Sequence, residues 1–208
     1  MRSGRLRAAG IRLALALGAC LGSEAAAEGP WNVEAIAGGT GWERQFADPA
    51  EVAAPGWTLR AWVRPSALPE GRAHVAGVGG PTGAAYHLCI DGRAPALCTD
   101  SGVLARGRRA LEPGRWHAMA AVIGEGRAAL YVDGRLVSSA ALPGPVEPLE
   151  PRLSVALAGA GQGRYAGRVA GLVFEPRVLQ PEALAAAFGA APDDGLARYE
   201  PASPSWPT

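Results

Sequence analysis

The chain contains carboxylates and histidines that could act in acid–base chemistry, but not in the spacing that catalysis requires. Some all-β glycoside hydrolases carry a Glu-x-Asp-x-Glu pattern on one strand, so that the acid and the nucleophile face one cleft. This pattern does not occur in the sequence. Asp133 precedes Gly134 and has no carboxylate partner two residues away. We interpret Asp133 as a turn former.

The three histidines, His74, His87 and His117, do not belong to a nucleophile motif. The sequence has no Gly-x-Ser-x-Gly elbow, and the complete lack of lysine excludes a phosphate loop of the Gly-x-x-x-x-Gly-Lys type. Residues 77–80, Gly-Val-Gly-Gly, predict a turn. We therefore predict that the protein is not an enzyme. A glycoside hydrolase or lyase with an atypical site is the alternative.

Two cysteines could form a covalent link. Cys89 and Cys98 flank the turn signal Asp91-Gly92, so their sulfur atoms are expected to meet across adjacent strands. An even pair of cysteines in an exported protein favours a structural disulfide. A metal site or a redox pair is the alternative, but His87 is the only histidine close in sequence and no second cysteine pair occurs. We predict no metal ligands.

Residues 1–27 predict a signal peptide. Four arginines precede a short apolar run at 13–19, and Ala25-Ala26-Ala27 offers a cleavage site. The run is too short to span a bilayer as a helix. Leu17-Gly18-Ala19-Cys20 also resembles a lipobox, which would make Cys20 a lipidated N-terminus. We expect a secreted or periplasmic protein, with a membrane-anchored lipoprotein as the alternative.

Cleavage after Ala27 leaves 16 arginines and 18 acidic residues. The arginines form no stripe along the sequence, so composition argues against a nucleic-acid partner. The 29 glycines and 18 prolines favour short strands joined by turns.

Two-residue periodicity dominates the part of the chain after residue 31. Residues 57–63 alternate between apolar and polar side chains, whereas residues 116–122 are apolar on both faces and predict a central strand. Asp133-Gly134 joins two strand-like runs and predicts a hairpin with a type I′ turn. Further strands are expected at residues 153–158 and 168–175.

One helix is expected at residues 180–188, with Pro181 near its first position and Gly189 as its stop. Many short strands, one late helix and no β–α–β alternation predict an all-β fold: an antiparallel two-sheet jelly-roll sandwich. The sandwich domain is expected at residues 28–190, followed by a proline-rich tail at residues 191–208.

Four segments resemble motifs of the laminin-G-like domains in the concanavalin A-like lectin/glucanase family. They occur in family order and read WTLRAWVRP at 57–65, RWHAMAAV at 115–122, LYVDGRLV at 130–137 and GRVAGLVF at 167–174. One departure is that Ala170-Gly171 stands where the family has an acidic pair. The resemblance implies a jelly roll that binds ligands on its rim loops or on a sheet face.

On this basis we predict a non-catalytic module that binds a glycan or a protein. An accessory subunit docking on a partner enzyme is the alternative. Aromatic and arginine side chains facing away from the core are the candidate ligand contacts: Arg60, Trp62, Arg64, His117 and Tyr131. We predict no cofactor. Relatives that use calcium leave calcium as an alternative, with Asp91, Asp100 and Asp133 as the acids near turns.

Overall fold

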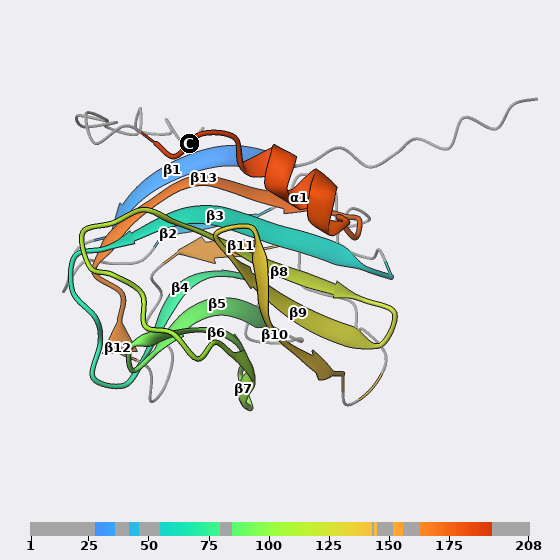
Figure 1. The fold of residues 1–208 in the computed structure, drawn as a ribbon, viewed down its shortest axis with the longest axis horizontal. Helices are drawn as coiled ribbons and strands as arrows, with labels where there is room; N and C mark the ends of the chain where they lie inside the picture. Colours follow the sequence, from blue (N-terminus) through green and yellow to red (C-terminus); the bar gives the residue numbers. More distant parts are fainter. Residues whose placement is uncertain are drawn as a thin grey trace, which may run out of the picture.

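The computed structural model describes residues 28–35, 42–45, 55–79, 85–142, 144, 152–155 and 163–192, with the first two segments and residue 164 as backbone only. The described strands form two sheets that stack face to face (Figure 1). The six-stranded sheet has the order β1 (Glu28–Ala35), β13 (Gly167–Glu175), β3 (Trp57–Pro65), β8 (His117–Gly124), β9 (Arg127–Val132) and β10 (Arg135–Ala141).

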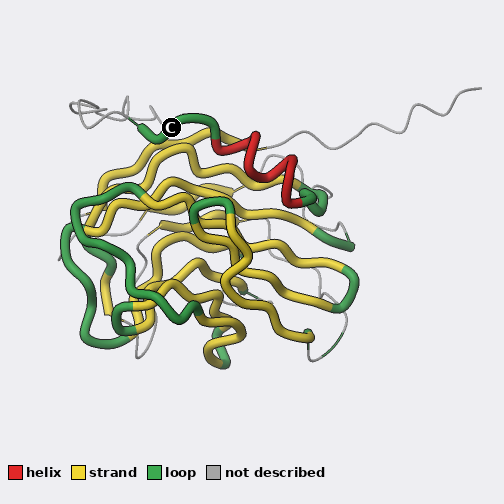
Figure 2. Tube along the Cα trace, in the orientation of Figure 1, coloured by secondary structure: helices red, strands yellow, loops and turns green. Residues whose placement is uncertain are grey.

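The seven-stranded sheet has the order β2 (Trp42–Gln45), β11 (Arg152–Val155), β4 (Arg72–Val78), β5 (Tyr86–Asp91), β6 (Ala94–Thr99) and β7 (Gly102–Arg106), with β12 (Gly163–Arg164) also paired to β4. All pairs are antiparallel except β12 with β4. Strands make up most of the tube in Figure 2, and longer loops lie along its left-hand edge. The predicted two-sheet sandwich is confirmed.

The core lies between the sheets and follows the predicted alternation. Along β3, Trp57, Leu59, Ala61 and Val63 are fully buried in the main hydrophobic cluster, together with side chains of the facing sheet. Both faces of β8 are apolar, because Met119 and Ala121 face the core and Ala120 and Val122 belong to a second buried cluster on the outward side. The alternation therefore assigns every second residue of these strands to an outward face, where the candidate site lies.

The β9–β10 hairpin is formed as predicted. Asp133 and Gly134 have φ values of 49° and 74°, the positive angles that a type I′ turn requires at both positions. The turn between β5 and β6 differs by one residue, since Asp91 pairs with Ala94 and Gly92 and Arg93 form the turn.

One turn prediction was wrong. Residues 77–80 were expected to form a turn, but β4 continues through Gly77 to Val78. Position 77 has no room for a larger side chain. A Cβ at this position would overlap His87 Nδ1 and lie 3.0 Å from His74 Nε2. The glycine therefore permits two imidazoles to pack over the strand.

Helix α1 (Pro181–Phe188) lies on the outward face of the six-stranded sheet (Figure 1). It begins and ends as predicted, with Gln180 as N-cap, Pro181 in its first turn and Gly189 as C-cap. Leu184 is its buried residue and packs with Ala120 and Val122 of β8. No helix in the described part of the chain is long and apolar enough to cross a bilayer.

The predicted signal peptide, Cys20 and the tail beyond residue 192 lie outside the described residues.

Candidate ligand-binding groove

Arg60 and Trp62 face outward from β3, as predicted, but helix α1 covers them. The Trp62 indole N–H donates to Phe188 O at 3.1 Å, and the two rings meet edge to face with centroids 5.7 Å apart. Arg60 donates to Ala187 O at 2.9 Å and pairs with Glu175 at 3.1 Å. Both side chains therefore anchor the end of the helix to the sheet.

His117 was predicted to face away from the core, and this is wrong. It lies on the inward side of β8, opposite Val63, with 5% of its surface exposed. Its Nε2 accepts a hydrogen bond from the Glu112 backbone N–H at 3.0 Å, so Nδ1 carries the proton and donates to Asp133 Oδ2 at 3.1 Å. The imidazole thus has no free nitrogen for a ligand.

Asp133 is held from two sides. Besides binding His117, it accepts a hydrogen bond from the Ala118 N–H at 2.9 Å. These contacts fasten the β9–β10 turn to the start of β8, which agrees with its interpretation as a turn former.

The remaining two candidates, Arg64 and Tyr131, contact other parts of the protein. Arg64 Nε donates to Gly114 O at 2.7 Å and holds the loop before β8. Tyr131 is half-buried and packs against the small cluster beneath α1. Of the predicted ligand contacts, Trp62 alone lines the groove that the described residues form.

The groove lies between three structures: the loop at Gly114, the β9–β10 turn and the C-terminal end of α1. Its volume is about 820 Å³, within the range of ligand pockets. It is lined by Trp62, Gly114, Arg115, Trp116, Ala118, Asp133, Gly134, Ala185, Phe188, Gly189, Ala191 and Pro192.

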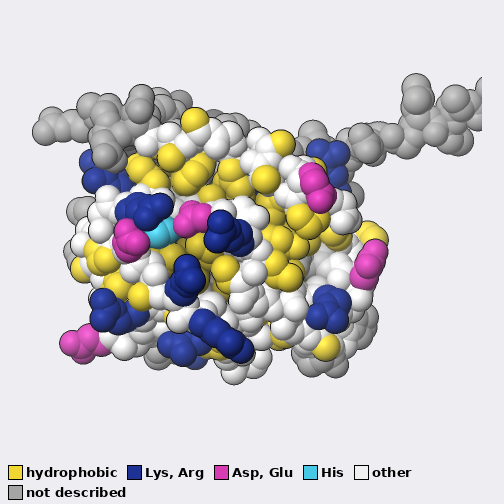
Figure 3. All heavy atoms as spheres, in the orientation of Figure 1, with side chains coloured by type: hydrophobic (Ala, Val, Ile, Leu, Met, Phe, Trp, Pro, Cys, Tyr) yellow, Lys and Arg dark blue, Asp and Glu magenta, His cyan; other side chains and the backbone are white. Residues whose placement is uncertain are grey.

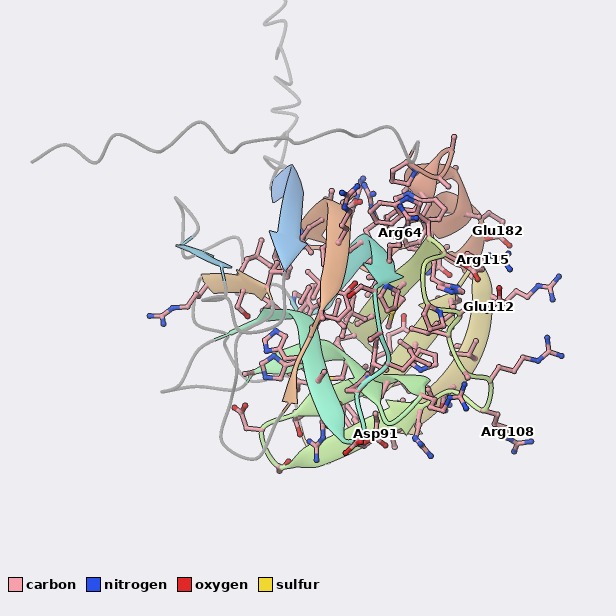
Figure 4. The ribbon with its side chains drawn as sticks, turned by 90° about the vertical axis from the view of Figure 1, so that its left-hand side faces the viewer. Arg64, Asp91, Arg108, Glu112, Arg115 and Glu182 are labelled. Carbon is pink, nitrogen blue, oxygen red and sulfur yellow. The ribbon has the colours of Figure 1, made fainter. Side chains whose placement is uncertain are left out.

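Aromatic and polar groups meet in this groove. Trp62, Trp116 and Phe188 give it apolar surfaces, and Arg115 and Asp133 contribute charge. Arg115 pairs with Glu112 at 3.2 Å in an exposed contact. Figure 4 shows Arg64, Glu112, Arg115 and Glu182 gathered in one part of the molecule, and Figure 3 shows arginines around exposed apolar surface on one face.

One polar atom of the groove-lining residues lacks a partner. The indole Nε1 of Trp116 is buried and makes no hydrogen bond within the described structure. A buried donor without an acceptor costs roughly 1–3 kcal/mol.

The sequence pointed to the region of the groove but missed three of its main residues. Trp116 was interpreted as a strand residue, Phe188 as a helix residue, and Arg115 as part of the motif at residues 115–122. No sequence signal identifies them, because the groove forms only when residues 114–118 and 185–192 meet.

The predicted alternative of a calcium site receives no support. Asp91 pairs with Arg106 at 2.9 Å, Asp100 contacts His87 at 3.2 Å, and Asp133 is bound as described. Among the described residues, no group of three or more His, Cys, Asp or Glu side chains is arranged to hold a metal ion.

Cys89 and Cys98 come together, but as free thiols. Cys89 lies opposite Ala96, and Cys98 lies opposite His87, so the two cysteines are diagonal neighbours rather than a direct pair. Both are fully buried in a small cluster with Ala96. The disulfide stays a prediction.

An all-β jelly roll with a groove on an outward sheet face defines a class of sandwich domains found in lectins and glycan-active proteins. The chain matches the model of the concanavalin A-like lectin/glucanases superfamily over residues 38–185, and it belongs to that family. No curated protein matches the chain.

Solved structures share the fold at low sequence identity. Domain 4 of AbnA, an extracellular arabinanase from Geobacillus stearothermophilus solved with arabinotriose, has a TM-score of 0.57 and 15% identity over 75% of this chain and 87% of that one. The binding domain of botulinum neurotoxin DC in complex with SialylT has a TM-score of 0.58 and 6% identity, covering 76% of this chain and 42% of that one.

Trypanosoma rangeli sialidase has a TM-score of 0.53 and 19% identity over 67% of this chain. The match covers 23% of the sialidase, so this chain corresponds to about a quarter of that enzyme. These likenesses show the fold alone.

Proposed function

We propose that this chain is an exported, non-catalytic carbohydrate-binding module that holds a saccharide in the groove between α1 and the β9–β10 turn. The observation that carries the proposal is the combination of the aromatic surfaces of Trp62, Trp116 and Phe188 with the charged groups of Arg115 and Asp133. Apolar sugar faces pack on aromatic rings. Arg115 and the exposed edge of Asp133 would contact sugar hydroxyls.

A binding role rather than catalysis is supported by how the nearby titratable groups are occupied. Asp133 accepts hydrogen bonds from His117 and from Ala118 N, and Glu112 pairs with Arg115. Both nitrogens of His117 are engaged. Hydrolysis needs one carboxyl to donate a proton and a second carboxylate to act as a base or nucleophile. These groups serve the turn and the loop instead.

Export is proposed from residues 1–27. Mass spectrometry of the protein from its native host distinguishes the two processing routes. An N-terminus at Glu28 supports a secreted or periplasmic protein, and a diacylated Cys20 supports a lipoprotein. An unprocessed Met1 contradicts export.

Binding is tested with a glycan array followed by calorimetry on the best ligand. The Trp116→Ala variant is expected to bind at least tenfold more weakly. Trp116→Phe keeps a smaller aromatic surface, so a smaller loss of about fivefold is expected. Arg93→Ala is the matched control, because Arg93 is an exposed arginine on the β5–β6 turn of the other sheet. Equal affinities for the wild type and Trp116→Ala would reject the groove as the site.

A further inference from the structure

A second cluster of reactive side chains lies far from the groove, on the outward face of the seven-stranded sheet. His87 and Cys89 alternate along β5 with the core residues Leu88 and Ile90, so they point away from the core. The strand register places His74 of β4 opposite Cys89, and Cys98 of β6 opposite His87. All four side chains are buried, with exposed fractions of 0–8%.

The two imidazoles of this cluster meet above one glycine. The ring centroids of His74 and His87 are 4.3 Å apart. A Cβ on Gly77 would overlap Nδ1 of His87 and lie 3.0 Å from Nε2 of His74. One nitrogen of each ring therefore lies next to the same point in space.

Asp100 fixes which nitrogen of His87 is free. The Asp100 Oδ1 atom lies 3.2 Å from His87 Nε2, so Nε2 carries the proton and donates to the carboxylate. Nδ1 therefore carries an unshared lone pair. This atom is buried and has no hydrogen-bond partner within the described structure. A carboxylate behind a histidine in this way orients the ring and raises its basicity as a metal ligand.

His74 Nε2 has one neighbour of its own, the hydroxyl of Ser154 on β11 at 3.3 Å. Ser154 is 3% exposed, so it contributes an oxygen beside the two nitrogens within the same buried site. Burial, followed by the charge of the other imidazole, lowers the pKa of His74. Burial also lowers the pKa of His87, against the opposing effect of Asp100. Neutral imidazole is the form that binds metal.

We propose that His74 and His87 bind a divalent transition-metal ion that prefers imidazole, such as Zn²⁺, Ni²⁺ or Co²⁺, with water and the Ser154 hydroxyl completing its coordination. Two imidazole nitrogens suit these ions, whereas Ca²⁺ and Mg²⁺ require oxygen ligands. With only two nitrogen ligands from the chain, the ion keeps exchangeable positions. The site does not depend on the proposed saccharide binding.

Two features of the surroundings set the affinity. Arg72 lies near enough to disfavour positive charge on His87, and Asp100 offsets it. The thiols of Cys89 and Cys98 contact each other, and this contact with burial raises the pKa of Cys89. The Cys89 thiol is therefore protonated, whereas the same contact lowers the pKa of Cys98.

The test is a Zn²⁺ titration of the purified mature protein without an affinity tag, followed by imidazole ¹H–¹⁵N NMR. The chain has three histidines, so each ring is observed separately. His74 and His87 are expected to shift until one equivalent is bound, while His117, whose nitrogens are both engaged, stays unchanged. Unchanged spectra, or three rings that shift alike without saturation, would overturn the proposal.

Two variants distinguish the orientation of His87 by Asp100 from the general effect of losing one negative charge. Asp100→Asn is expected to weaken Zn²⁺ binding by about tenfold, because His87 loses the carboxylate that orients it. Asp91→Asn makes the same charge change at the end of β5 and is expected to leave the affinity unchanged. If both variants weaken binding equally, the proposed role of Asp100 is wrong.

The thiols are tested by replacing both with alanine. The Cys89→Ala/Cys98→Ala variant is expected to retain the Zn²⁺-dependent shifts of both rings. If it does not fold, Co²⁺ absorption of the unmodified protein gives the answer, since thiolate ligands produce charge-transfer bands that imidazole ligands do not. Loss of binding in the variant, or such bands in the unmodified protein, would overturn the two-imidazole site.

Discussion

The outward faces of the two sheets differ in how their side chains are used. On the six-stranded sheet, large side chains project outward, and Arg60 and Trp62 bind the carbonyls at the end of α1. On the seven-stranded sheet, the outward residues of the cluster are His74, His87, Cys89, Cys98 and Ser154, all buried. The first face builds an open groove beside a helix. The second holds compact reactive groups over a glycine. In both sheets, strand alternation points every second side chain outward. The two outward faces differ in chemistry because different residue types occupy those positions.

The largest expected effect comes from removing the anchor of α1. Trp62→Ala eliminates the hydrogen bond to Phe188 and the ring contact, and we expect the free energy of unfolding to fall by about 2–3 kcal/mol, less than the 3–5 kcal/mol of a fully buried Trp. Amide hydrogen exchange of residues 181–188 is expected to accelerate. Chemical denaturation and exchange measured by mass spectrometry check both effects.

Trp62→Phe serves as the control for this change, since it keeps a smaller aromatic ring beside Phe188 and loses the hydrogen bond, at a cost of about 1–2 kcal/mol. If amide exchange in α1 is the same in the wild type and Trp62→Ala, other contacts hold the helix. The statement that outward side chains of the six-stranded sheet anchor α1 would then be wrong.

A smaller effect is expected from oxidation on the other face. We propose that Cys89 and Cys98 form a disulfide in the exported protein, giving up two protons and two electrons to a thiol–disulfide oxidase. A loop of this length stabilises by roughly 2–3 kcal/mol in the chain-entropy model, and native strain reduces the gain. Non-reducing mass spectrometry should find two hydrogens missing, and reductant should lower the melting temperature. Full alkylation of the unfolded protein without reductant would contradict this.

The sequence predicted what depends on local pattern. Alternation at residues 57–63 and the Asp133-Gly134 pair were sufficient for β3 and the β9–β10 hairpin. It could not predict that α1 would cover Trp62, because residues 62 and 188 are brought together only by the completed sandwich. The same limit applies to His74. An irregularity in the β4–β5 register between His74 and Ala76 sets its place beside His87, and the register is not visible in the spacing of the residues.

The smallest predicted effect concerns pH and acts on the histidine face. The pKa values of His74 and His87 are lowered in the folded state, chiefly by burial. Relative to an unfolded value near 6.5, the unfolded chain therefore binds more protons below that pH. Stability from these groups is fully present above about pH 6.5 and is lost as the pH falls below it towards the folded pKa values. Urea denaturation at pH 7.5 and pH 5.5 measures this loss.

The matched comparison is the His74→Gln/His87→Gln variant, in which neither position titrates. Its stability is expected to change less between pH 7.5 and pH 5.5 than that of the wild type. Asp100→Asn should make the loss larger and extend it to lower pH, because the carboxylate raises the folded pKa of His87 and its removal widens the gap to the unfolded value. An identical pH dependence in all three proteins would mean that the buried imidazoles do not resist protonation. The outward face of the seven-stranded sheet would then be accessible to water in solution, as the groove on the other sheet is.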